Sequence, residues 1–238
     1  MRDPVTRRPI ILIGSGKYLG RDDRTSAIPQ QAFYGIRDYA GSSSYPIRVN
    51  QLVTQTITQA AVDANGVALR SVSGYTAPTG TLPSTTPNMI LRKLDTATGK
   101  PIRVSVQANG WRIPLNIAAE PGERADRRAI PDYSPNVTAL YSMIPLGDDP
   151  CDPGRRFGVM FLDAATGAAL SATGTGNVGA VLRNPTPIPD PVVREGGGEI
   201  MIPGLPPAIS GTINDAIKQA YTPAPWHRGA WKELLDLQ

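Results

Sequence analysis

Very few side chains in this 238-residue sequence belong to the types that carry out catalytic or metal chemistry. The sequence contains one histidine, His227, and one cysteine, Cys151, so it cannot supply a zinc site built from several such ligands or a thiol relay. It also lacks a Gly-x-Ser-x-Gly motif that would present a nucleophilic serine to the histidine. We therefore interpret His227, which stands between Trp226 and Arg228, as a solvated or packed side chain.

The acidic pairs Asp22-Asp23 and Asp148-Asp149 are of the residue type that hydrolases use as paired carboxylates. Both pairs lie beside Gly or Pro, in turns where Asp is favoured because it bonds to nearby backbone groups. No stretch supplies oxygen ligands at the alternating positions of a calcium-binding loop. Cys151 fits two roles, an inert thiol in a reducing compartment or the partner of a cysteine outside this chain in a secreted protein.

A glycine-containing stretch that follows an apolar run, Gly14–Gly20, is superficially similar to a phosphate-binding loop. A P-loop would require Gly at the position of Ile11 and a hydroxyl side chain of Ser or Thr at the position of Tyr18. The residues that follow reach Pro29 without forming an apolar helical face, so the dinucleotide-binding fingerprint is missing as well. The sequence therefore argues against nucleotide binding.

The composition indicates a folded chain and excludes several classes of partner. With 24 Gly and 24 Pro there is little room for long helices, and 40% hydrophobic against 18% charged residues is too apolar for a disordered chain. The formal charge of +4 is carried by dispersed arginines, so we expect no nucleic-acid binding. No apolar run approaches the roughly 20 residues of a membrane span, and no signal peptide is evident at the N-terminus. We expect either a cytoplasmic protein or a fragment whose signal lies upstream.

Short apolar segments separated by turn residues predict an all-β fold. The continuous run Ile10–Ile13, which ends at Gly14, is typical of a strand that is buried on both faces. Further strands are predicted at residues 49–57, 67–72, 89–94, 102–106, 137–144 and 159–162. Many short strands at close spacing indicate a sandwich, a barrel or a propeller.

A turn sequence that repeats within the chain narrows this choice. The motif Leu-Asp-x-Ala-Thr-Gly occurs at Leu94–Gly99 and at Leu162–Gly167, and Val62–Gly66 has a related form. In each, the Asp can accept bonds from turn amides and the Gly supplies a positive φ, so we predict three hairpins. Such turns occur in many β proteins, but repeated hairpins of one form favour the repeated blades of a β-propeller.

The chain divides into three predicted parts. Residues 1–182 carry the propeller blades, and residues 183–209 form a Pro/Gly-rich connector that cannot contribute to a central sheet. Residues 210–238 are predicted to close the same domain. They begin with a short helix, since apolar residues at helical spacing follow the possible caps Ser210 and Thr212.

A series of short motifs occurs along the chain in one order. They are Ile11–Leu19, Gln31–Asp38, Leu52–Ile57, Arg70–Ser73, Gly110–Leu115, Gly122–Arg124, Ile144-Pro145, Asp149–Cys151, Met160–Gly167 and Ala230–Leu234. Together they resemble the PilC/PilY-type proteins associated with the tip of bacterial type IV pili, in the C-terminal part of that family's β-propeller. The resemblance extends from Ile10 to Leu234 with gaps in the connector, and Ser15 and Lys17 stand where the family has Thr and Arg.

The resemblance implies a non-enzymatic protein that is secreted to the cell surface, at the pilus tip or the outer membrane. It implies a part in pilus assembly and in adhesion, with pilins, minor pilins and a surface or host-cell receptor as partners. The family's calcium-binding loop lies upstream of the matched part, so no cofactor is expected in this chain. Since a blade needs roughly 40–50 residues, the chain would supply the last part of a ring. We expect it to pack against the upstream part of the same protein.

Three tyrosines are the predicted partner-contact residues, because Tyr is enriched in binding hot spots. Tyr39, Tyr45 and Tyr75 stand in Gly/Ser-rich stretches, where packing of the loops is an equally good interpretation of them. The alternative function is that of a quinoprotein-like dehydrogenase propeller fragment, since blades of such enzymes carry similar Leu-Asp turns. Those turns are usually followed by a Trp, which residues 100–102 and 168–170 lack. A cytoplasmic scaffold propeller is the third possibility.

Overall fold

The described part of the chain is built almost entirely from β-strands, which confirms the predicted all-β class. The computed structural model describes residues 2–3, 7–16, 30–38, 46–64, 66–125, 129–134, 136–145, 155–182, 192–193 and 200–201. Within these ranges the one helical segment is a 3-10 turn, η3, at Val49–Gln51. The predicted C-terminal helix after residue 209 lies outside the described residues, and the predicted part boundaries stay a prediction.

The strands form one large sheet and two separate pairs. Their bounds are β1 Ile10–Gly14, β2 Ala32–Arg37, β3 Val53–Gln59, β4 Val67–Thr76, β5 Asn88–Leu94, β6 Pro101–Gln107, β7 Gly110–Pro114, β8 Ile130–Ser134, β9 Val137–Pro145, β10 Arg155–Asp163, β11 Gly176–Leu182, β12 Val192–Val193 and β13 Ile200–Met201. Nine of them form a sheet in the order β1-β2-β7-β3-β4-β11-β10-β9-β8, while β5 pairs with β6 and β12 with β13.

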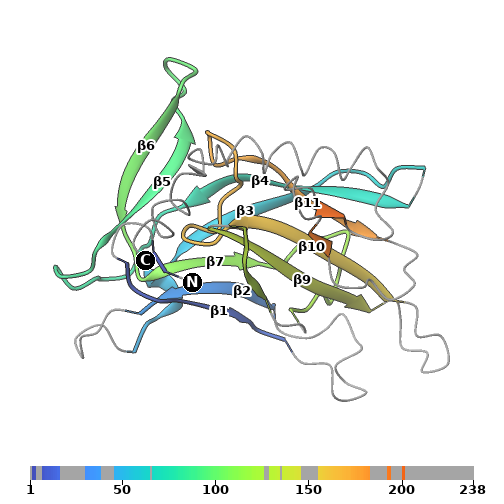
Figure 1. Cartoon of the computed structure of the whole chain (residues 1–238), viewed down its shortest axis with the longest axis horizontal. Helices are drawn as coiled ribbons and strands as arrows, with labels where there is room; N and C mark the ends of the chain where they lie inside the picture. The colour runs from blue at the N-terminus through green and yellow to red at the C-terminus, as the bar shows by residue number, and fades with distance from the viewer. Residues whose placement is uncertain are drawn as a thin grey trace, which may run out of the picture.

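The large sheet is curled, and the β5–β6 hairpin projects away from it (Figure 1). Neighbouring strands of the sheet run antiparallel except at the junction of β3 and β7, where Val53 pairs with Trp111 and Thr54 with Arg112 in parallel. This curled all-β arrangement is consistent with part of a β-propeller. Its described strands are hydrogen-bonded across the whole sheet, from β1 to β8.

The strand β1 differs from its prediction in one respect. The apolar run indicates burial on both faces, but β1 lies at the edge of the sheet and bonds to β2 alone among the described strands. Ile11 and Ile13 are each 48% exposed, whereas Ile10 is buried. A run of apolar residues shows that a strand can be buried on two faces, and the position of the strand in the sheet decides whether it is.

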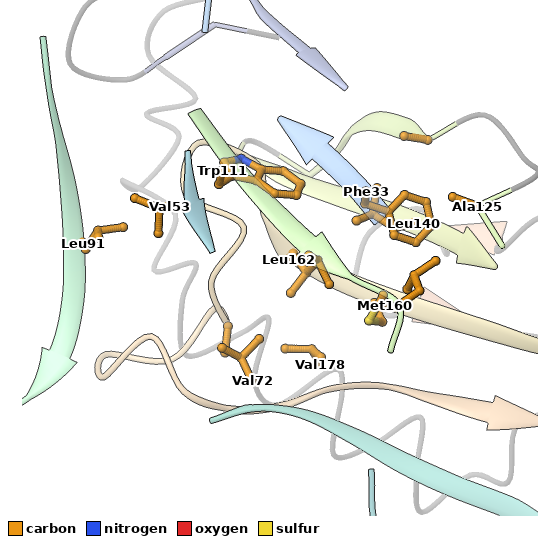
Figure 2. Close-up of a cluster of buried hydrophobic side chains, with 14 of the residues drawn as sticks. Phe33, Val53, Val72, Leu91, Trp111, Ala125, Leu140, Met160, Leu162 and Val178 are labelled. Carbon is orange, nitrogen blue, oxygen red and sulfur yellow. The ribbon is translucent and has the colours of Figure 1, made fainter. Parts of the chain in front are cut away.

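The two larger core clusters lie on the two faces of the sheet. One combines residues of β2, β3, β4, β5, β7, β9, β10 and β11, and Figure 2 shows Phe33, Trp111, Leu140, Met160 and Leu162 of this cluster. The other lies on the opposite face of β9, β10 and β11. Every residue of β9 from Val137 to Ile144 is therefore buried, as its apolar composition predicts.

The three repeated turns form as predicted. Gly66, Gly99 and Gly167 have φ angles of 77°, 65° and 68°, which a residue with a Cβ adopts only with strain. In the second and third turns the Asp accepts a bond from the amide two residues later, at 3.0 Å for Asp95 and 2.9 Å for Asp163. The turns join β3 to β4, β5 to β6 and, with a longer loop, β10 to β11.

The two matching copies of the turn have opposite environments. Residues 96–100 are exposed at the end of the β5–β6 hairpin, whereas residues 164–170 are buried. A guanidinium nitrogen of Arg92 lies 2.9 Å from a carboxylate oxygen of Asp163. Burial raises the pKa of Asp163 above its ordinary value, although Arg92 opposes the shift. The hydroxyl of Thr98 and a turn amide instead hold the pKa of Asp95 below its ordinary value.

The same substitution in the two turns should therefore have different consequences. We expect Asp163→Ala to lower the free energy of unfolding by about 2 kcal/mol, because it leaves Arg92 and two turn amides without their acceptor. Asp95→Ala is the matched control and should cause a smaller loss, since water can replace the carboxylate there. Urea denaturation followed by circular dichroism measures both. Equal losses would contradict the assignment of a structural role to the buried copy.

Candidate functional site

The structure describes one of the three predicted contact tyrosines. Tyr75, on β4, is half-buried and packs against the core cluster that contains Trp111, and this burial raises its pKa. Tyr39 and Tyr45 lie outside the described residues, as do His227, Cys151 and both acidic pairs. The role of the three tyrosines in contacting a partner therefore stays a prediction.

A buried ion pair stands between the loop that follows β7 and the middle of the sheet. Arg70, on β4, and Glu123 have fully buried side chains, and their two nitrogen–oxygen distances are 2.5 and 2.7 Å. The hydroxyl of Ser142, on β9, donates a further bond to Glu123. A Cβ at Gly158, on β10, would collide with Ser142 and Arg70, so a glycine there leaves the space that the pair occupies.

The pair extends into a longer polar network. The side-chain oxygen of Gln59 accepts a bond from Arg70 at 3.1 Å, and its amide donates to Glu120 at 2.7 Å. Glu120 in turn pairs with Arg156 at 2.7 Å. Two arginines and two glutamates therefore compensate one another, with each buried carboxylate satisfied by a cation and a hydrogen bond. This arrangement holds the loop of residues 115–125 on the sheet.

The indole of Trp111 makes a second buried polar contact. Its ring nitrogen donates to the carbonyl of Ala164 at 2.9 Å, in the buried turn, and the ring covers Gly167 closely enough that a Cβ would collide with it. A Cβ at Gly35, on β2, would collide with the other side of the ring. A tryptophan thus does pack on a Leu-Asp turn, but it comes from β7 and not from the residues after the turn.

An open cleft of about 470 Å³ lies where β7, β3 and β4 meet. It is lined by Arg48, Val49, Asn50, Leu52, Thr54, Thr76, Ala77, Thr79 and Arg112. Strand register places three of these side chains in one row, because Thr54 pairs with Arg112 on one side and with Thr76 on the other. Their neighbours Val53 and Trp111 are fully buried on the opposite face, so the row faces outward.

Backbone bonds hold the wall of this cleft in place. The carbonyl of Asn50, in η3, accepts bonds from the amides of Thr79 at 3.0 Å and Gly80 at 2.8 Å. The side chain of Gln51 donates to the carbonyl of Thr81 at 2.8 Å. A Cβ at Gly80 would collide with the end of the Asn50 side chain, which would have to move to make room for it.

Sequence reasoning did not find the cleft. Its strongest local signal is Arg112, which belongs to one of the motifs of the resemblance, but the partners of this residue come from segments about sixty positions earlier in the chain. The described residues contain no group of three or more His, Cys, Asp or Glu that could hold a metal ion. The expected lack of a cofactor stays a prediction. No helix in the described ranges has the length and apolarity to cross a membrane.

The curled sheet, its buried ion pairs and its outward-facing cleft define a β-sheet module whose cleft is lined in part by two arginines. The chain is similar to the type IV pilus biogenesis factor PilY1 of Pseudomonas aeruginosa (strain UCBPP-PA14), with 26% identity over 179 residues. The match covers 73% of this chain but 14% of that relative, so the chain spans a small part of its length. The sequence matches no model of a protein family, and no solved structure matches it.

The buried pair of Arg70 and Glu123 predicts a large effect of neutralising the carboxylate. We expect Glu123→Gln to lower the free energy of unfolding by about 3–5 kcal/mol, because it leaves a fully buried guanidinium uncompensated. Glu120→Gln is the matched control and should cost less, since its partner Arg156 is 17% exposed and retains access to water. Urea denaturation measures both variants.

A double variant separates charge from packing. Replacing Arg70 with Met and Glu123 with Leu removes both charges and should recover much of the stability that Glu123→Gln loses. If the double variant is less stable than Glu123→Gln, the loss comes from packing of the side chains and not from the unpaired charge.

Proposed function

We propose that this chain is a non-enzymatic module of a PilC/PilY-type protein that acts in type IV pilus assembly and in adhesion to surfaces or host cells. The observation that carries the proposal is the similarity to the pilus biogenesis factor PilY1 over 179 residues. On this proposal the chain is the C-terminal part of the propeller of a longer protein, and it is located at the cell surface, at the pilus tip or the outer membrane.

The positions of the shared motifs support a common fold. The hydroxyl of Ser15, which follows β1, both donates to and accepts from the backbone of Ala32, at 3.1 and 2.8 Å. Gly35 provides the space for Trp111, and Glu123 anchors the buried network. Gly35 and Glu123, which carry the resemblance, therefore occupy positions where the fold needs their size or charge, and position 15 uses a hydroxyl, which the Thr of the family also has. A distant relative that shares the fold would retain them for that physical reason.

The edge of the sheet supports a partner within the same longer protein. The outer backbone groups of β1 have no strand beside them among the described residues, and Ile11 and Ile13 are half-exposed on it. An unpaired strand edge with apolar side chains favours the addition of another strand. We propose the upstream part of the same protein as the source of that strand, with pilins, minor pilins and a surface or host-cell receptor as the other partners.

Fractionation of the source organism tests the pilus assignment. We expect an antibody raised against this chain to detect it in the fraction of sheared surface pili. The signal should disappear from that fraction in a strain that lacks the major pilin, because the protein would then have no pilus to follow. A strain in which the gene for this chain is deleted controls for antibody specificity. Detection in the soluble cytoplasmic fraction alone would contradict the proposal.

A further inference from the structure

We propose that the cleft between η3, β3, β4 and β7 binds a small polyhydroxylated acid, with its carboxylate at Arg48 and Arg112 and its hydroxyls at the neighbouring threonines. The inference goes beyond the pilus role, because it concerns the ligand chemistry of this chain and holds for any cellular location. It depends on the charge, the hydrogen-bonding groups and the construction of the cleft.

The two arginines of the cleft differ from Arg70, Arg92 and Arg156 in their partners. Arg70, Arg92 and Arg156 each pair with a carboxylate of the protein at 2.5 to 2.9 Å. Among the described residues, the lining of the cleft contains Arg48 and Arg112 and no acidic residue, and neither arginine forms an ion pair with another described residue. The described lining therefore carries two positive charges that none of its own residues compensates.

Arg112 retains hydrogen-bond donors for an external oxyanion. Its Nε donates to the hydroxyl of Thr54 at 2.8 Å, and strand register places the two residues side by side on β7 and β3. A guanidinium has five N–H donors, so this contact leaves the terminal nitrogens for a ligand. Carboxylates match their spacing with two parallel hydrogen bonds.

The other lining residues favour an anion that also carries hydroxyl groups. Thr76, Thr79 and Asn50 add two hydroxyls and an amide, which can both donate to and accept from the hydroxyls of a ligand. Among the described residues, the lining includes no aromatic side chain that could act as a platform for a nucleobase or another flat apolar ring. A volume of about 470 Å³ is within the range of small-molecule sites, and a single acidic sugar is of suitable size and chemistry.

The cleft is also built before a ligand arrives. Its floor is held by strand pairing, and its wall is held by the bonds that Asn50 and Gln51 make to the loop of residues 79–81. Binding therefore does not have to order the loop, which removes part of the entropic cost of association. A preformed site of this kind favours measurable affinity for a ligand with few contacts.

Calorimetric titration of the full 238-residue chain tests the proposal, with glucuronate as the probe. We expect glucuronate to bind and glucose, its neutral analogue, to give no detectable binding. Arg48→Gln and Arg112→Gln should each weaken glucuronate binding by about tenfold or more, since each removes a charge-assisted contact. Arg103→Gln, at an exposed position of β6 away from the cleft, is the matched control and should bind as the unchanged chain does.

Three results would overturn the proposal. The first is no binding of glucuronate, and the second is equal binding by the unchanged chain and the double variant Arg48→Gln/Arg112→Gln. The third is binding of inorganic sulfate as tight as that of glucuronate, which would show that the hydroxyl contacts add nothing and that the cleft is a simple anion site. Thermal melts of each variant test whether a loss of binding comes from unfolding. Because Arg48 is exposed to solvent, Arg48→Gln is the variant that should disturb the fold least.

Discussion

The burial of Trp111 is the constraint on which the arrangement of the sheet depends. The indole lies at the one parallel junction of the sheet, and its ring fills the space between Gly35 on β2 and Gly167 in the buried turn. Its N–H would be unsatisfied without the carbonyl of Ala164, so the turn must lie at this position. Because β7 alternates, the same placement directs Arg112 outward into the cleft.

The arginines on the two faces of the sheet at this junction differ in whether a carboxylate neutralises them. In the interior, Arg70 and Glu123 are withdrawn from water together, and Ser142 and Gln59 satisfy their remaining bonding groups. At the outer face, Arg112 is held by a neutral hydroxyl and keeps its charge uncompensated. The first arrangement stabilises a unique packing of the loop, and the second leaves attraction available for a ligand.

Much of the fold follows from local sequence, and the cleft does not. The strands with continuous or alternating apolar residues and all three Asp/Gly turns were predictable, because backbone preference and burial act within a few residues. Strands β2 and β11 are interrupted by glycines at close contacts, and β7 begins with one, so the apolar runs of these strands are short. The strand predicted at residues 49–57 begins only at Val53, and the segment before it forms η3. There the carbonyl of Asn50 accepts bonds from the amides of Thr79 and Gly80. Neither this contact nor the β3–β7 junction has a signature in neighbouring residues.

The pairing of β3 with β7 also determines when the cleft forms during folding. β4, β5 and β6 come between these strands in the chain, so their contact closes a loop of more than fifty residues. Closing this loop costs conformational entropy before the contact can stabilise the chain, so such pairings form late in folding. The hairpins of β3–β4 and β5–β6 can form while the outer face is still incomplete. The two arginines of the cleft are therefore brought together only once β7 has paired with β3, so that binding at this face would report that this pairing has formed.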